Sequence, residues 1–175
     1  LNTGWFSFTN TDNARGGEAL DGTGFFAAMA GLDGTDGGFL VSSSENDGAS
    51  VYQTVSLTAA TTYRFTIALG TNSIPAIDRP DAKFGVVVFN SGFSNQEAGT
   101  FGTLAAGGDS FSDYSVEWTA ASTGNFNVGL RNLGYVAGTG SITQSALFMD
   151  NARLEIIPEP STFALVGLSV LAAMS

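Results

Sequence analysis

Short runs in which apolar and polar residues alternate recur along this chain of 175 residues, with glycine-rich turns between them. The clearest runs are 51–57, 63–69, 114–119 and 125–131. Each has a period of two, which places its apolar side chains on one face, as a half-buried antiparallel strand requires. A period of 3.6 residues is not sustained before Ile157. The pattern therefore excludes a helical bundle and a fold that alternates helices with strands.

The number and spacing of these runs predict a fold. About eight strands with long connections favour an all-β, antiparallel two-sheet β-sandwich with Greek-key crossings, most simply a jelly roll. Residues 84–89 are apolar on both parities and predict a central strand that is covered on two sides. The stretches 70–80, 90–108 and 134–140 are rich in Gly, Pro, Asn and Ser and are expected to be long loops.

The composition removes several classes of function. The chain has no histidine and no cysteine, which excludes Ser-His-Asp triads, thiol nucleophiles, disulfides and the usual zinc ligand sets. Six basic against sixteen acidic residues give a net charge of −10, so neither nucleic acid nor an anionic membrane surface is a suitable partner. A carboxylate pair is the remaining route to catalysis, but no acidic residue lies in a recognisable motif. We expect that the protein is not an enzyme.

The character of the sequence changes at Pro158. Pro158-Glu159-Pro160 is a rigid break, because two prolines fix φ and stiffen the residues before them. The following stretch 163–174 is almost entirely apolar, but it is shorter than the roughly 20 residues of a membrane-spanning helix. We expect one domain at 1–157 and a separate short apolar extension at 158–175.

This C-terminal segment resembles a known sorting signal. Pro158-Glu159-Pro160 followed by an apolar run is similar to the PEP-CTERM sorting tail of exported proteins. The family pattern also has a short basic cluster, which this sequence does not show. The resemblance implies that a Gram-negative bacterium exports the protein to its cell surface or surroundings, with membrane contact only during export.

The apolar tail also predicts how copies of the chain associate. The residues expected to contact a neighbouring copy are Phe163, Ala164, Val166, Leu168, Val170 and Ala172. A tail added as a strand to the open sheet edge of a neighbour satisfies backbone groups on both partners, and head-to-tail repetition builds a filament. The leading interpretation is an exported surface or matrix structural subunit that self-assembles through this tail, with fibrils as one expected form of the assembly.

The body of the chain has a resemblance of its own. Four segments, 51–55, 63–65, 114–118 and 148–154, make it similar to the jelly-roll carbohydrate-binding modules and their galactose-binding-like relatives. Such sandwiches serve many functions, so the resemblance identifies a fold better than a function. It implies an alternative interpretation, a non-catalytic carbohydrate-binding module that retains the cell's own extracellular polysaccharide.

The same resemblance implies a metal site. Such jelly rolls often hold a structural calcium ion on the last strand, where this chain has Asp150. Calcium needs several oxygen ligands, and Asp12 or Glu18 is expected to supply them from the early part of the chain. The alternative is that Asp150 caps a turn through a hydrogen bond with its own backbone.

Binding of a sugar needs exposed aromatic rings, because the apolar face of a sugar stacks on a ring while its hydroxyls take hydrogen bonds. Trp118 shares its parity with Val116 and is expected in the core. Trp5 and Phe6 near the N-terminus and Tyr135 in a glycine-rich stretch are the candidate exposed rings. The alternative is that all three anchor the core or a loop.

Overall fold

Ten β-strands make up the regular structure of the described chain. The computed structural model describes residues 8–9, 14–19, 37–46, 49–71, 79–108 and 110–158, with side chains from residue 38 onward. The strands are β1 (Phe8–Thr9), β2 (Ala14–Ala19), β3 (Gly37–Ser42), β4 (Ser50–Leu57), β5 (Thr62–Gly70), β6 (Ala82–Asn90), β7 (Gln96–Leu104), β8 (Phe111–Thr119), β9 (Gly124–Tyr135) and β10 (Ser145–Ile156).

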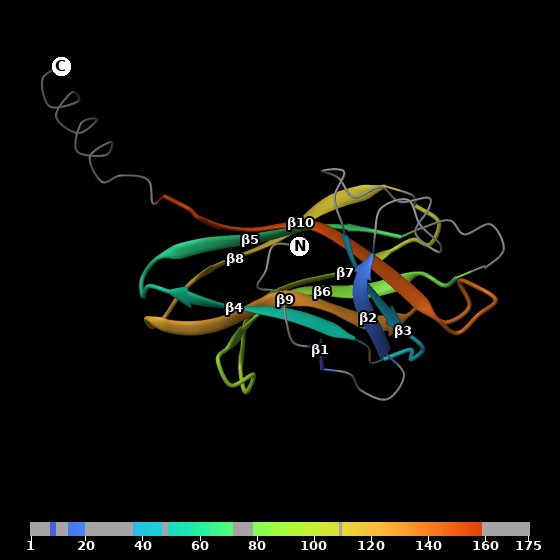
Figure 1. Ribbon diagram of the computed structural model, residues 1–175, viewed down its shortest axis with the longest axis horizontal. Coiled ribbons are helices and arrows are strands. Elements are labelled where there is room, and N and C mark those ends of the chain that lie inside the picture. The colour runs from blue at the N-terminus through green and yellow to red at the C-terminus, as the bar shows by residue number, and fades with distance from the viewer. Residues whose placement is uncertain are drawn as a thin grey trace, which may run out of the picture.

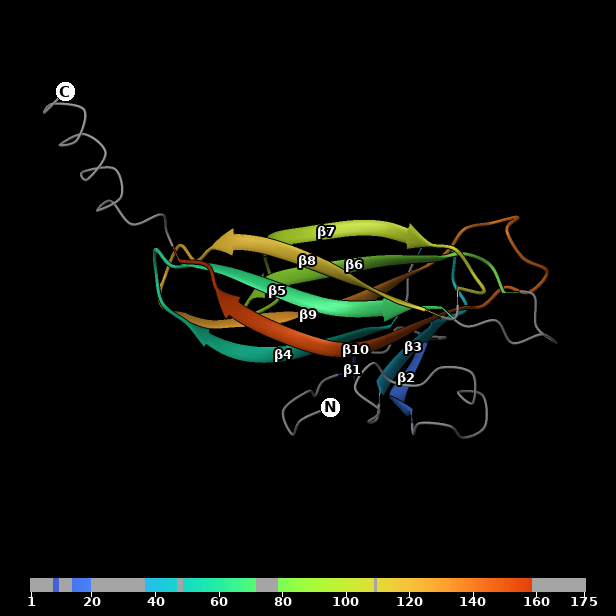
Figure 2. The same ribbon diagram turned by 90° about the horizontal axis from the view of Figure 1, so that it is seen from above.

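These strands form two five-stranded sheets that stack face to face (Figures 1 and 2). The first, sheet A, has the order β1-β4-β9-β6-β7, and the second, sheet B, has the order β2-β3-β10-β5-β8. Every pair of neighbouring strands is antiparallel. Figure 1 shows β5, β8 and β10 of sheet B above β4, β6 and β9 of sheet A. The predicted antiparallel jelly-roll sandwich is confirmed.

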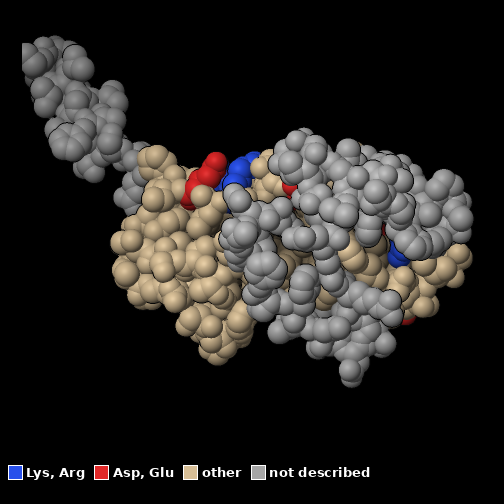
Figure 3. Space-filling view, in the orientation of Figure 1, with Lys and Arg blue, Asp and Glu red and all other residues tan. Residues whose placement is uncertain are grey.

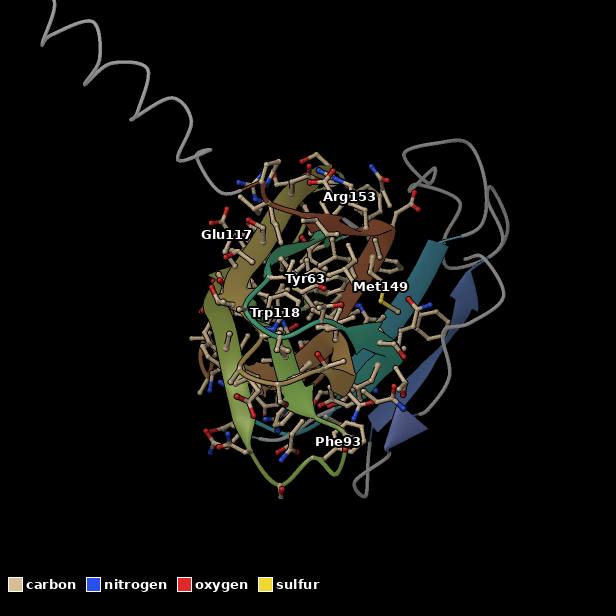
Figure 4. All side chains as sticks on the ribbon, turned by 90° about the vertical axis from the view of Figure 1, so that its left-hand side faces the viewer. Tyr63, Phe93, Glu117, Trp118, Met149 and Arg153 are labelled. Atoms are coloured by element: carbon tan, nitrogen blue, oxygen red, sulfur yellow. The ribbon has the colours of Figure 1, made fainter. Side chains whose placement is uncertain are left out.

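The core lies between the two sheets and consists of the apolar parity of each alternating run. In β5, Phe65, Ile67 and Leu69 are at most 1% exposed. Tyr63 packs beside Trp118 of β8, with ring centroids 5.7 Å apart, and Figure 4 shows both rings in the interior. The expectation that Trp118 belongs to the core is therefore confirmed.

The central position expected of residues 84–89 is also confirmed. They form most of β6, which lies between β9 and β7 in sheet A. Val86, Val87 and Val88 are fully buried although they point alternately to opposite faces of the sheet. Both faces of this strand are therefore covered at its centre.

One of the stretches expected to be a loop contains a strand instead. The stretch 90–108 contains β7, which pairs with β6 from Gln96 opposite Phe89 to Leu104 opposite Ala82. It lies at the edge of sheet A and alternates between exposed and half-buried residues. Its partly buried positions are filled mainly by Ala, Thr and Gly, so the strand lacks the row of large apolar residues that the sequence interpretation required.

Pro158 is the last residue that the structure describes. Strand pairing continues to Ile157, whose N–H donates to the carbonyl oxygen of Thr62 at 2.8 Å. The boundary between residues 157 and 158 stays a prediction, and Glu159, Pro160 and the apolar tail lie outside the described residues. Within the ranges described, no helix has the length and apolar character needed to cross a membrane.

Candidate functional site

Most of the residues predicted as glycan contacts or calcium ligands cannot be placed. Trp5, Phe6 and Asp12 lie outside the described residues, and of Glu18 only the backbone in β2 is described. Tyr135 and Asp150 are placed with their side chains. These two residues lie at different strands of different sheets, Tyr135 on β9 of sheet A and Asp150 on β10 of sheet B.

The expectation that Tyr135 is an exposed ring is wrong, because this side chain is only 8% exposed. The strand β9 continues through Gly134, so Tyr135 pairs with Ala82 of β6 and does not stand in a loop. Its hydroxyl lies 3.5 Å from Oε1 of Glu45. Burial, and next the Glu45 carboxylate, raise the pKa of Tyr135. This side chain is buried in the sandwich and offers no stacking surface.

Asp150 is buried on β10, at a register irregularity in the pairing with β5. Its Oδ1 accepts a hydrogen bond from the N–H of Asn151 at 2.6 Å, and Asn151 has a φ of 49°. This contact is the backbone cap that the sequence left open as the alternative to calcium. The strand registers place Glu18 opposite Gly38 and Gly38 opposite Met149. The Glu18 backbone is therefore two strands and one row away from Asp150.

The described side chains do not complete a calcium site. No group of three acidic side chains gathers anywhere among them, whereas calcium takes six to eight oxygen ligands. The calcium ion stays a prediction that depends on Asp12 and on the side chain of Glu18.

A chelator tests the calcium prediction. If Asp150 binds calcium, EDTA should lower the melting temperature by several degrees, because an ion that binds only the folded state stabilises it by mass action. Asp150→Ala should melt at a lower temperature and should show no further change with EDTA. Differential scanning calorimetry measures both effects. A wild-type melt that is identical with and without EDTA would remove the metal.

One part of the outer face of sheet B is charged and holds two ion pairs. Another part of the same face carries an apolar cluster, which consists of Ala146, Phe148, Phe39, Val41 and Phe111. Arg64 of β5 contacts Glu117 of β8 at 2.5 Å, and Arg153 of β10 contacts Asp113 of β8 at 2.5 Å. The hydrogen bond with Asp113 raises the pKa of Arg153. Figure 3 shows charged side chains along the top, on the side of sheet B. Such exposed pairs contribute at most about 1 kcal/mol each to stability, and the charged part of this face is solvated.

The outer face of sheet A is aromatic. We call the rings of Tyr52, Phe89, Phe93 and Phe101 the aromatic face. Tyr52 on β4 is opposite Gly129 of β9, and Phe101 on β7 is opposite Gly85 of β6. Phe93 lies on the hairpin 90–95 between β6 and β7, which projects below sheet A in Figure 1 and carries the Phe93 label in Figure 4.

Glycines beneath the rings allow them to lie close to the sheet. A Cβ atom at Gly85 or at Gly99 would come within 2.8 Å of the Phe101 ring, and one at Gly129 within 2.7 Å of the Tyr52 ring. Glycine is needed at these positions because any side chain would lift the ring above it. Phe101 is nevertheless 53% exposed, so the sheet supports one side of the ring and more than half of its surface is open to solvent.

Polar groups surround these rings. Asn127 accepts a hydrogen bond from Thr54 Oγ1 at 2.7 Å, and farther along the same two strands Ser56 donates to Asn125 at 2.8 Å. Arg131 of β9 is opposite Gly85, which places it in the row of Phe101.

Among the five basic side chains that the structure describes, only Arg131 has no hydrogen-bond or ion-pair partner. The partners of the other four are Glu117 for Arg64, Gln144 for Arg79, the Glu45 carbonyl for Lys83 and Asp113 for Arg153. The guanidinium of Arg131 is thus available for a ligand on the aromatic face.

Comparison with known proteins shows the fold. A cyclase from Fischerella sp. in its apo form has a TM-score of 0.63 and 17% identity, over 91% of this chain and 85% of that chain. A cyclase from Fischerella sp. TAU in complex with 4-(1H-indol-3-yl)butan-2-one has a TM-score of 0.61 and 15% identity, over 92% and 88%. Neither a protein-family model nor a curated relative matches the sequence.

A third similar structure belongs to a larger enzyme. The CBM22-1–GH10 modules of Clostridium thermocellum xylanase 10B, complexed with xylohexaose, have a TM-score of 0.55 and 13% identity. The match covers 90% of this chain and 27% of that one, so this chain spans about a quarter of that protein. The class that the fold defines is a jelly-roll β-sandwich like those of carbohydrate-binding modules and of these cyclases. The expectation that the protein is not an enzyme stays a prediction, because enzymes are among the similar structures.

Proposed function

We propose that the protein is a non-catalytic carbohydrate-binding module whose aromatic face binds a polysaccharide chain. The observation that carries the proposal is Phe101, a ring supported from below by two glycines and 53% exposed above them. A ring in this position offers the flat apolar surface on which the apolar face of a sugar stacks. An exposed edge strand usually carries polar or charged residues at such a position, so a phenylalanine there calls for a functional reason.

The other groups of the aromatic face fit the same ligand. Of the three exposed large apolar side chains in the described ranges, Phe93 and Phe101 lie on this face and Ile156 on the far sheet. Arg131 presents planar donors suited to two neighbouring hydroxyl or carboxylate oxygens. An apolar surface with a few placed polar groups is typical of a ligand site.

The similar structures support the proposal without deciding it. One of them holds the CBM22-1 and GH10 modules of a xylanase in complex with xylohexaose. The proposal also takes up the expectations drawn from the tail, namely export and a cell-surface location with the cell's own polysaccharide as the partner. Self-assembly through the tail depends on residues 163–175, which lie outside the described part of the chain, and it stays a prediction.

Replacing Phe101 tests the proposed function. Affinity electrophoresis in gels containing xylan, mixed-linkage β-glucan or polygalacturonate should show that the wild-type chain is retarded by at least one polymer. Phe101→Ala should weaken that binding by about tenfold or more, which corresponds to about 1.4 kcal/mol, because the stacking surface is lost.

A matched control separates stacking from general loss of apolar surface. Ile156 is 63% exposed on β10 of sheet B, and Ile156→Ala should bind as the wild type does. Absence of retardation of the wild-type chain in all three gels would contradict the proposed function. Equal retardation of the wild type and of Phe101→Ala would move the site away from the aromatic face.

A further inference from the structure

The hairpin 90–95 places an aromatic residue where the backbone favours glycine. Phe93 has a φ of 56°, in the left-handed region that L-residues with a bulky side chain rarely adopt. The preceding residue is Gly92, which does not have a positive φ and would have open space around a Cβ atom. Glycine would adopt the left-handed conformation of residue 93 more easily than phenylalanine does. The glycine of this hairpin nevertheless stands at the preceding position, 92.

Intramolecular packing explains only part of this arrangement. The Phe93 ring meets Tyr52 with centroids 4.9 Å apart and Phe89 at 5.9 Å. Even so, 42% of the residue is exposed. A residue that is held in a strained conformation and remains largely open to solvent is characteristic of functional sites.

Hydrogen bonds fix the hairpin in this conformation. Oδ1 of Asn90 accepts from the N–H of Ser94 at 2.9 Å, and the N–H of Phe93 donates to the Asn90 carbonyl at 3.1 Å. From the sheet, Nδ2 of Asn127 donates to the carbonyls of Asn90 and Ser91 at 3.1 and 3.2 Å. Asn127 is 3% exposed, so the hairpin is attached to β9 by a buried side chain.

The hairpin and Phe101 lie at different ends of the aromatic face. Phe101 is opposite Gly85 on β6, and the Phe93 ring packs on Phe89, four residues farther along that strand. Four residues of a strand span about 13 Å. A single sugar ring cannot contact both positions, whereas a chain of several sugars can.

We infer that Phe93 is a second ligand-contacting ring and that the site binds an extended oligosaccharide that contacts both Phe101 and Phe93. This inference rests on the proposed function and adds a specificity for chain length. The strained backbone at Phe93 is retained because the position of its ring serves the ligand.

Substitution by glycine and by asparagine tests this inference. Both residues tolerate the left-handed region, so Phe93→Gly and Phe93→Asn remove the ring without adding strain, whereas Phe93→Ala keeps the strain. Binding of fragments of two and six sugar residues, prepared from the same three polymers, is measured by isothermal titration calorimetry. The wild type should bind the hexasaccharide of its polymer about tenfold or more tightly than the disaccharide.

In Phe93→Gly and Phe93→Asn, this advantage of the hexasaccharide should disappear while disaccharide binding is unchanged. Their melting temperatures should be no lower than that of Phe93→Ala. A hexasaccharide advantage that survives in both variants would overturn the inference, as would its loss together with disaccharide binding. If the wild type binds no polymer and no fragment, it is the proposed function that fails.

Discussion

Gly129→Ala should strongly destabilise the folded chain. A Cβ atom at this position of β9 would lie 2.0 Å from the carbonyl oxygen of Val51 and 2.9 Å from Cα of Tyr52. Both are backbone atoms of the paired strand β4, so relief of the clash requires the two strands to separate. We expect a loss of about 3 kcal/mol or more, seen in thermal denaturation as a melting temperature lowered by about 10 °C.

Gly124 provides the matched control for this prediction. It begins the same strand, and a Cβ atom there would have no neighbour within 4 Å. Gly124→Ala should therefore melt within a few degrees of the wild type. Similar melting temperatures for the two variants would show that β4 and β9 do not approach one another as described.

Phe65→Ala should be the second strongly destabilised variant. Phe65 is 1% exposed in β5 and belongs to the core cluster between the sheets. Removal of a buried phenylalanine ring typically costs about 3–5 kcal/mol, because the surrounding residues fill the cavity only in part. Urea denaturation followed by circular dichroism measures the loss.

Phe101→Ala is the natural comparison, since the same atoms are removed from a ring that is 53% exposed. Its unfolding free energy should change by about 1 kcal/mol or less, while its polysaccharide binding should fall. The Phe65→Ala variant should thus lose stability, whereas the Phe101→Ala variant should lose binding. A larger loss of stability for Phe101→Ala than for Phe65→Ala would contradict the assignment of core and surface.

The fold was predictable where large apolar residues alternate with polar ones. In β5, β8 and β9 the parity alone selects the row that faces the core between the sheets, and Phe65, Trp118 and Val128 are all buried in that core. In β7 the partly buried row is Ala98, Thr100 and Gly102. Residues this small give no hydrophobic signal in the sequence. They suffice at this edge because β6 and its neighbours supply the large side chains on that side of the sandwich.

The aromatic face could not be predicted for the same reason. Phe101 was assigned to a loop together with the rest of 90–108, so its position opposite Gly85 was not accessible from the sequence. The usable signals were Gly85 and Gly99, the two glycines beneath the Phe101 ring, since glycines in a strand often mark a ring or ligand that approaches the backbone closely. Tyr135 is the opposite case, because the glycine-rich stretch 134–140 predicts a loop, whereas β9 continues to Tyr135.

Asp150 shows the limit of a resemblance. The resemblance predicted a calcium ligand, and the residue is buried at the expected strand, but its Oδ1 accepts a hydrogen bond from the N–H of the next residue. A ligand set is a property of several chain segments at once, and a single acidic residue does not determine it.

Backbone NMR of the labelled protein tests the central claim most directly. During titration with the hexasaccharide of the polymer that retards the wild-type chain, amide shifts should concentrate in β7 and in the hairpin 90–95, around Phe101 and Phe93. The amides of β5 and β8 on the far sheet should not move. Shifts that cluster on sheet B, or a spectrum that no hexasaccharide changes, would contradict a polysaccharide site on the aromatic face.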